Sequence, residues 1–420
     1  MKRSLNPVAR VYLFACTCIL FLFASCSEKE LPPIDARQIF TQLDATVQEY
    51  YFFQSELDLP SIYQSVARTA GIRSEPDKAR EALLNQLAET NDRAAIYTAL
   101  NTYLSALPGG QNDFYPAESL LMARESQRQA GVGIVFHRVE SDQPARFLVV
   151  DVLEGSAAYR AGIEPGLFIE KVNGAAIDGY DMMQVLGTIK GDAGTTVTIG
   201  MSDGRDYELE RGPIELRPLL HAEWERAADQ KILYLVPRLA QEDTAAAIRG
   251  LMQRSGQPEA VVLDLRKYYH GDYRANFYIA DLFLSSGQLG GLKLTGTEPE
   301  TFEADADVLF KGPVYIIVGR HSSTIALALA RIFQGQSDVT ILGPGSMSLP
   351  AYLTHVAELK GAIEVHITKG YVMGPDGQGL YKTNLQPDVT TEVGILQRPP
   401  LTTPDSTDNA QMEIARRLGM

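Results

Sequence analysis

The sequence predicts an α/β protein that is preceded by a helical region and a β-rich domain. Three patterns support this class: apolar residues three and four apart over 35–128, short strands and turns over 129–213, and strands that alternate with helices over 214–420. With 420 residues, of which 45% are hydrophobic and 21% charged, the chain is long enough for several domains with separate cores.

Residues 1–25 have the pattern of a secretory signal peptide. Basic residues precede the apolar run VYLFACTCILFLFAS, which is short for a membrane span and ends in small residues before Cys26. The order FASC is similar to a bacterial lipobox, which implies a lipoprotein whose Cys26 is cleaved and lipidated; an uncleaved membrane anchor is the alternative. Residues 26–34 are then a tether, and the expected location is the cell envelope, on the periplasmic or the cell-surface side of the outer membrane.

Charge and cysteine content exclude several kinds of partner and chemistry. The net charge is −14 and becomes −17 without residues 1–25, so we expect no nucleic-acid partner. Cys16 and Cys18 leave with the signal and Cys26 is acylated, so the mature chain has no thiol for a disulfide, a zinc site or a nucleophile. The sequence contains neither an HExxH pattern nor a P-loop, and we expect no metal and no cofactor.

Residues 35–128 are predicted to form a helical domain. The segments DARQIFTQLDATVQEYYFF, EPDKAREALLNQLAET and DRAAIYTALNTYLSAL each place apolar residues on one helical face. The stretch LPGGQNDFYP ends this pattern with proline and glycine. Because these helices carry no catalytic motif, we expect a cap or packing domain.

The segment 129–213 carries GVGIVF, then EGSAAYRAGIEPGLFIEKVNG, then IKGDAGTTVTI. This order resembles a PDZ domain, which implies a groove for a peptide or a protein C-terminus. In such a groove successive backbone N–H groups bind the carboxylate, and the following strand offers an unpaired edge. The implied groove residues are Gly131, Val132, Gly133, Ile134 and Val135; alternatively, the glycines only form a tight turn into a strand.

The segment 214–420 alternates strands and helices. KILYLVPRL, EAVVLDLRKYYHG and GPVYIIVGR are predicted strands, and DTAAAIRGLMQRS and ANFYIADLFLSSG are predicted helices. This order predicts a parallel sheet with crossover helices. Catalytic groups of such sheets lie at the carboxyl ends of the strands, where both KYYHG and GRHSST are expected.

The order of helical cap, PDZ-like domain and α/β core resembles the carboxyl-terminal processing peptidases, peptidase family S41. VVLDLR and the late GYVMGPDGQGLYKTNLQPDV add to the resemblance, which covers nearly the whole mature chain. It implies a core of the ClpP/crotonase type over 214–420 that ends in a C-terminal helix. It also implies a serine nucleophile, a lysine general base and backbone N–H groups that stabilise an oxyanion.

The resemblance places the nucleophile at Thr324 and the base at Leu349. No lysine occurs between Lys311 and Lys360. A hydroxyl without a proton acceptor is a poor nucleophile, so the sequence predicts a degenerate catalytic centre.

The implied oxyanion region, His270 and Gly271, also departs from the family. Tyr268, Tyr269 and His270 stand where the family has a small, glycine-rich turn. We expect these bulky side chains to line and narrow the cleft.

The hydroxyl residues Ser322, Ser323 and Thr324 have two interpretations. As helix N-cap residues they accept bonds from backbone N–H groups at the start of the next helix. As nucleophiles they need a base other than lysine, for which His355 is a better candidate than the adjacent His321.

The function that the sequence predicts is therefore peptide binding. We expect a lipid-anchored protein with the architecture of a processing peptidase and a degenerate centre, whose PDZ-like groove binds peptides or protein C-termini. Two alternatives stay open: an active serine endopeptidase of the C-terminal processing type, and a purely structural lipoprotein.

Overall fold

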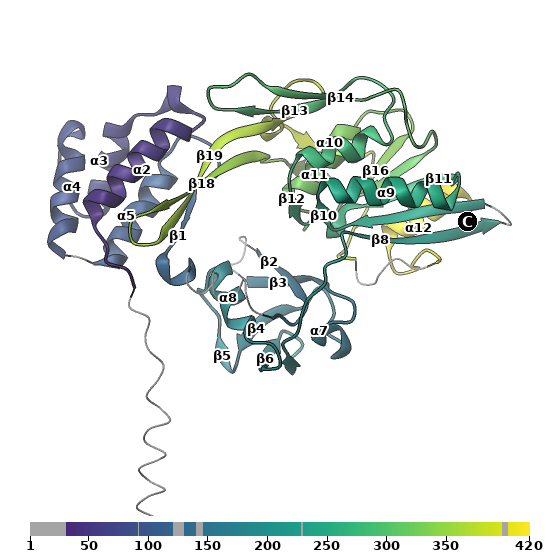
Figure 1. Cartoon of the computed structure of the whole chain (residues 1–420), viewed down its shortest axis with the longest axis horizontal. Helices are drawn as coiled ribbons and strands as arrows, with labels where there is room; N and C mark the ends of the chain where they lie inside the picture. Colours follow the sequence, from purple (N-terminus) through teal and green to yellow (C-terminus); the bar gives the residue numbers. More distant parts are fainter. Residues whose placement is uncertain (1–30, 91, 121–129, 140–145, 228–229, 397–401) are drawn as a thin grey trace, which may run out of the picture.

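The computed structural model describes residues 31–90, 92–120, 130–139, 146–227, 230–396 and 402–420. These residues form a helical domain, a β-rich domain and an α/β core (Figure 1). The predicted signal peptide, the lipidated Cys26 and the first part of the tether lie outside the described residues. Among the helices that are described, none is long and apolar enough to cross a membrane.

The helices bounded within the described residues of the helical domain are α2 (Ala36–Tyr50), α3 (Leu59–Thr69), α4 (Pro76–Thr90) and α5 (Arg93–Ser105). Three of them begin after an aspartate, Asp35, Asp58 or Asp92, whose side chain accepts a backbone N–H of the first turn. The three predicted helical segments are confirmed, and α3 is an additional helix between the first two. The apolar faces meet in one buried cluster.

Two strands from the far end of the chain complete this domain. β18 (Tyr352–Leu359) and β19 (Ile363–Met373) form a hairpin, and β1 (Asp113–Tyr115) pairs with β19. Ile363, Val365 and Ile367 are buried in the same cluster as the helices. Residues 352–373, which the prediction assigned to the core alone, therefore pack in both the helical domain and the core. Figure 1 shows this hairpin running from the helices to the core.

The β-rich domain is a sheet with the strand order β2-β3-β4-β6-β7, in which β5 pairs with β4. Its elements are β2 (Ile134–Val139), β3 (Arg146–Val152), α7 (Ala157–Arg160), β4 (Phe168–Val172), β5 (Ala175–Ala176), α8 (Met182–Ile189), β6 (Thr196–Met201) and β7 (Asp206–Glu210). β2 lies at one edge and pairs only with β3 among the described strands. One side of β2 is therefore open to an added strand.

The α/β core is built on a sheet with the order β21-β16-β15-β11-β9-β8. Its strands are β8 (Leu219–Ala227), β9 (Gln230–Pro237), β11 (Ala260–Asp264), β15 (Val314–Ile317), β16 (Val339–Gly343) and β21 (Val389–Thr390). All neighbouring pairs are parallel except β8 with β9, so the predicted parallel sheet is confirmed with one antiparallel edge strand. A second sheet joins the hairpin to β13 (Gln288–Leu294) and β14 (Glu300–Glu303).

Helices cover both faces of the core sheet. α9 (Glu242–Ser255), α10 (Arg274–Asp281) and α11 (Thr324–Phe333) pack on one face, and α12 (Asn409–Leu418) packs on the other, as the predicted C-terminal helix. Successive residues of β11 point to opposite faces, so Leu263 joins the first cluster and Val262 the second. Because both faces are covered, β11 and β15 are apolar along nearly their whole length.

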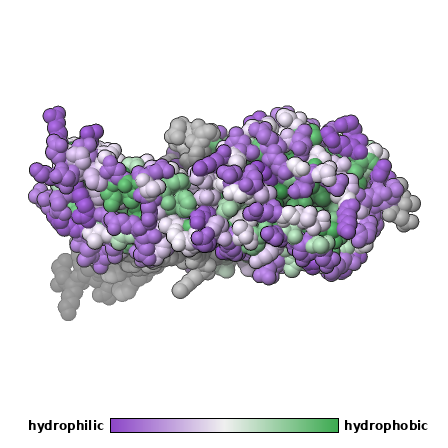
Figure 2. Space-filling model, turned by 90° about the horizontal axis from the view of Figure 1, so that it is seen from above, coloured by the Kyte–Doolittle hydropathy of each residue, from purple (hydrophilic) through white to green (hydrophobic). Residues whose placement is uncertain are grey.

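The face of the molecule in Figure 2 is mainly hydrophilic, with apolar side chains in small separate patches. Few large apolar residues are exposed among those described; one is Ile214, which borders the groove of the β-rich domain.

Candidate functional site

Two neighbouring strand ends build the candidate catalytic junction. β11 and β15 pair in parallel with Asp264 opposite Ile317, so the segments that follow them lie at one edge of the sheet. The Ser323 hydroxyl donates a 2.5 Å hydrogen bond to the backbone carbonyl of Tyr268 and so joins the two segments. The structure therefore brings together the two motifs that the sequence placed at strand ends.

The three junction hydroxyls have different roles. Ser323 is the N-cap of α11 and accepts the N–H of Ala326 at 3.2 Å. Ser322 accepts the N–H of Gly319 at 2.9 Å and closes the preceding turn. Thr324 is the first residue of α11, and its hydroxyl has no hydrogen-bond partner among the described residues. The N-cap interpretation is thus confirmed for Ser323. The hydroxyl of Thr324 is the one available to form a hydrogen bond with a ligand.

The position that the family resemblance assigns to the base is apolar and buried. Leu349 is 1% exposed and belongs to the main hydrophobic cluster of the core. No described lysine, histidine, aspartate or glutamate side chain hydrogen bonds with the hydroxyl of Ser322, Ser323 or Thr324. The junction therefore lacks a positioned proton acceptor among the residues that the structure describes.

The expectation that His355 stands in as a base needs correction. Its ring stacks on Tyr50 with centroids 3.6 Å apart and planes 8° apart, and it does not line the cavity at the junction. Burial, with Lys369 nearby, lowers the pKa of His355. The sequence did not predict this position of His355, because local spacing does not show that the hairpin carrying residue 355 extends to the helical domain.

The imidazoles that do line the junction cavity are His137 and His321. Their rings meet edge to face, with centroids 5.2 Å apart. Burial lowers the pKa of both rings; His321 further lowers the pKa of His137, and Arg320 that of His321. Both imidazoles are therefore neutral at pH 7, and neither bonds to a junction hydroxyl.

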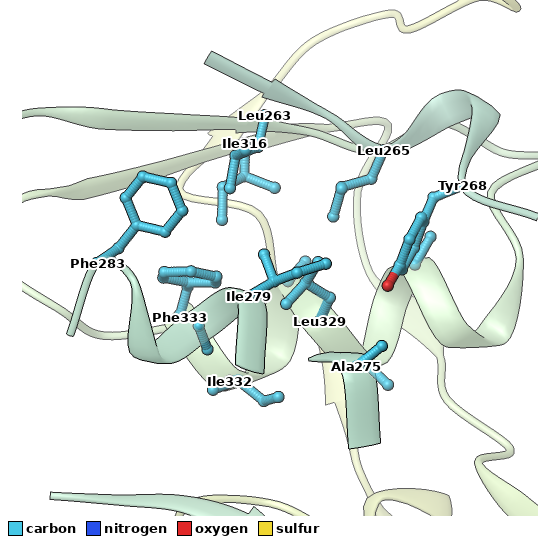
Figure 3. Close-up of a cluster of buried hydrophobic side chains, with 14 of the residues drawn as sticks. Leu263, Leu265, Tyr268, Ala275, Ile279, Phe283, Ile316, Leu329, Ile332 and Phe333 are labelled. Carbon is cyan, nitrogen blue, oxygen red and sulfur yellow. The ribbon is translucent and has the colours of Figure 1, made fainter. Parts of the chain in front are cut away.

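The tyrosines after β11 point to different places, which corrects the expectation that both line the cleft. Tyr268 is fully buried, its ring lies in the core cluster (Figure 3), and its hydroxyl donates to the Asn276 side chain at 2.9 Å. Tyr269 lines the junction cavity. Burial, with Asp151 nearby, raises the pKa of Tyr269 well above its usual value, so this tyrosine is neutral.

The implied oxyanion region is held by short parallel pairing. His270 and Gly271 form β12 and pair with Leu239 and Ala240, which form β10. Gly271 has a φ of 145°, and a Cβ there would lie 2.0 Å from the Ala240 carbonyl oxygen. Glycine at this position is therefore required by the close backbone approach.

The groove of the β-rich domain is an open cavity of about 720 Å³. It is lined by residues 131–134 at the start of β2 and by Leu186 and Ile189 of α8. The backbone N–H groups of Val132 and Gly133 have no hydrogen-bond partner among the described residues. Val135, which the resemblance placed in this groove, lines the junction cavity instead.

The glycines of the GVGI turn also have a structural role. Gly133 has a φ of 85°, and a Cβ there would lie 2.1 Å from the Ser156 Cβ. A Cβ at Gly131 would lie 3.3 Å from the Ile214 side chain. The glycines therefore form a tight turn that also lines a cavity, and a bulky residue at Gly133 would disturb both.

The groove adjoins the junction cavity. The junction cavity has a volume of about 670 Å³ and is lined by the three junction hydroxyls together with residues of the β-rich domain. The two cavities share Ile134, Phe136, Leu186 and Lys190. A peptide in the groove would therefore lead directly toward the start of α11.

A buried ion cluster that the sequence analysis missed connects the β-rich domain to the core. The guanidinium of Arg238 donates to the two carboxylate oxygens of Glu154 at 2.9 and 2.8 Å, and it lies 3.0 Å from Asp151. The ammonium of Lys267 donates to the other oxygen of Asp151. Asp151 and Arg238 are fully buried. The available signal was one aspartate inside the apolar strand FLVVDV.

Burial, the largest single cause, acts to raise the pKa of Glu154, but its hydrogen bonds and the positive charges of Arg238 and Lys267 together hold this pKa below its usual value. Lys267 is the buried lysine near the junction. Its partner is Asp151 rather than a junction hydroxyl, so it does not supply the missing base.

The fold and site define a protein with the architecture of a serine peptidase, in which a strand–helix junction presents a hydroxyl to a cavity. Residues 231–391, which lie within the α/β core, match the model of peptidase family S41. The resemblance seen in the sequence is thereby confirmed for the core.

Two of the curated relatives that this chain resembles are named as CtpA or CtpA-like proteases. The probable CtpA-like serine protease of Staphylococcus aureus (strain bovine RF122 / ET3-1) is 23% identical over 270 residues, which cover 62% of this chain and 52% of that protein. The carboxy-terminal processing protease CtpA of Bacillus subtilis (strain 168) is 20% identical over 324 residues, 76% of this chain and 68% of that protein. The chain thus spans about half the length of the staphylococcal relative.

A solved structure shares the fold. The photosystem II D1 C-terminal processing protease superposes with a TM-score of 0.64 at 20% identity, over 86% of this chain and 94% of that chain. At this identity the likeness supports the arrangement of the domains in space.

Proposed function

We propose that this protein is a lipid-anchored peptide-binding member of the S41 architecture whose catalytic centre is degenerate. The observation that carries the proposal is the pair of adjoining cavities that extend from the groove at β2 to Thr324, a hydroxyl with no hydrogen-bonded proton acceptor among the described residues. A site of this kind retains a ligand without a group that activates the nucleophile.

We propose that the β-rich domain binds as a PDZ domain. An extended peptide adds as a strand to the open edge of β2. Its terminal carboxylate accepts hydrogen bonds from the free backbone N–H groups of Val132 and Gly133. Its last apolar side chain contacts Ile134, Leu186 and Ile189, which line the groove.

Replacing Leu186 by aspartate is expected to weaken peptide binding about tenfold or more, because a charge enters the apolar wall and repels the terminal carboxylate. The measurement is fluorescence anisotropy with an N-terminally labelled peptide of ten residues that ends in an apolar residue. Met183→Asp is the matched control, since Met183 lies on the same helix but outside the lining of both cavities. Equal binding of free-acid and amidated peptides would contradict carboxylate recognition.

An active endopeptidase is the second candidate, favoured by the free hydroxyl of Thr324 in a cavity that also contains His321. We expect a fluorophosphonate probe to leave the wild-type protein unlabelled, because no described group hydrogen bonds with the Thr324 hydroxyl to accept its proton. The measurement is mass spectrometry of the intact protein after prolonged exposure. A covalent adduct that disappears in Thr324→Val would establish a working nucleophile and overturn the degenerate centre.

The lipid anchor is proposed from the FASC stretch alone. Cells fed an alkyne-tagged fatty acid are expected to yield tagged protein, and Cys26→Ser is expected to remove the tag. Cys16→Ser is the matched control, and this variant is expected to retain the fatty-acid tag. A tag that survives in Cys26→Ser would rule out this site of acylation.

A further inference from the structure

We propose that this protein selects peptides with an acidic side chain about three to five residues before the carboxyl terminus, which Arg320 binds at the junction cavity. The inference rests on the proposed function and deepens it, because it names the chemical class of the ligand. It concerns a contact that the core, rather than the groove, makes with the peptide.

The charge of the two cavities is opposite to that of the chain. The full sequence has 52 acidic and 38 basic residues. Among the described residues that line either cavity there is no aspartate and no glutamate, whereas Lys190 and Arg320 are both present. Neither of these two side chains forms an ion pair or hydrogen bond with another described residue. An acidic ligand would therefore meet uncompensated positive charge on an otherwise acidic protein.

The two cations lie at different points along the path of a bound peptide. Lys190 lies beside the GVGI turn, because the N–H of the next residue, Gly191, donates to the Ala130 carbonyl at 3.1 Å. Lys190 lines both cavities and is the cation on the side of the terminal carboxylate, whereas Arg320 lines the junction cavity but not the groove. Arg320 belongs to the loop after β15 and is exposed at the other end, next to His321.

The contact between His137 and His321 indicates which residue of a peptide bound along β2 would lie beside Arg320. A peptide antiparallel to β2 advances about 3.3 Å per residue, and Gly133 and His137 are four positions apart. With the carboxylate at Gly133, the residue beside His137 is therefore about three to five positions before the terminus. There the ring of His137 meets His321, and Arg320 is the adjacent residue.

The imidazoles add hydrogen-bond donors rather than charge. Both are neutral at pH 7, and a neutral imidazole carries one N–H. The positive charge at this end of the path therefore comes from Arg320, whose planar guanidinium suits a carboxylate.

The test compares two labelled peptides that differ only by glutamate or glutamine at the third to fifth positions before a free, apolar carboxyl terminus. By anisotropy at pH 7.5 and low salt, the glutamate peptide is expected to bind the wild-type protein about threefold to fivefold tighter. Arg320→Gln is expected to remove this difference by weakening only the glutamate peptide. Lys190→Gln removes the same charge near the carboxylate, and it is expected to weaken both peptides equally.

Lys171→Gln is the control for a general charge effect, since Lys171 is exposed on β4 of the same domain and lines neither cavity. It is expected to leave both affinities unchanged. Equal affinities of the two peptides, or a preference that persists in Arg320→Gln, overturn the inference while C-terminal binding stands. Failure of both peptides to bind the wild-type protein overturns the proposed function, and this inference with it. Thermal unfolding of each variant shows that it is folded.

Discussion

Asp151→Ala is expected to lower the free energy of unfolding by about 3–5 kcal/mol, since it leaves the buried ammonium of Lys267 without its partner. Arg238 loses one of its two carboxylate partners in the same variant. The measurement is urea denaturation at pH 7, followed by circular dichroism. Because the cluster joins β3 to the core, we expect the β-rich domain to separate from the core at a lower urea concentration than in the wild-type protein.

Two variants make this expectation specific. Asp206→Ala removes an exposed acid from the same sheet and is expected to change stability by less than about 0.5 kcal/mol. Glu154→Gln keeps an oxygen acceptor for Arg238 and is expected to cost less than Asp151→Ala. Equal stabilities of Asp151→Ala and the wild-type protein would show that the cluster does not hold the domains together.

The pH dependence of this contact follows from Glu154. Its pKa is lower in the folded protein than in the unfolded chain, so its contribution to stability is present above the usual carboxyl pKa and is lost as pH falls through the folded value. Between pH 6 and pH 3 we therefore expect the wild-type protein to lose more stability than Glu154→Gln.

Leu349→Lys is expected to lower the free energy of unfolding by about 3–5 kcal/mol at pH 7, because burial disfavours an ammonium group at a position that is 1% exposed. The family base therefore cannot be restored by this substitution without cost. The measurement is urea denaturation of the variant at pH 7, 8.5 and 10. Burial depresses the folded pKa of such a lysine, so the cost is full below that pKa and shrinks as pH rises toward 10.

Leu349→Met is the matched control and is expected to cost less than about 1.5 kcal/mol at every pH, because it nearly conserves volume and adds no charge. A fully stable Leu349→Lys protein would show that the site still accommodates a base. Labelling of Thr324→Ser/Leu349→Lys by a fluorophosphonate would then show that the rest of the centre is still arranged for catalysis.

Local patterns predicted the elements that carry the site. The helical spacing of residues 35–105, the apolar run before Asp264 and the junction before α11 all appear in the structure as expected. They were predictable because a helix buried on one face repeats its apolar residues three and four apart, whereas a strand buried on both faces is a continuous apolar run. The family resemblance then placed the nucleophile at Thr324 and the base at Leu349, and in the structure Leu349 is an apolar, buried residue of the core.

Contacts between distant segments were not predictable. Sequence spacing does not say that Tyr268 points into the core while Tyr269 lines the cavity, because a short 3-10 turn over Leu265–Lys267 intervenes. Nor does it say that His137, from another domain, is the imidazole beside His321.

The sequence by itself determined the class of fold, the order of the domains and the absence of a lysine at the junction. These features depend on residue type and on the local spacing of apolar residues, which are the same whatever the tertiary structure. Only the tertiary structure decided which groups share a cavity, which lysine is paired with Asp151, and that the groove opens toward α11. Such contacts depend on how the domains pack against one another. The packing energy is the sum of contacts among many residues that are far apart in the sequence, so a short motif does not predict it.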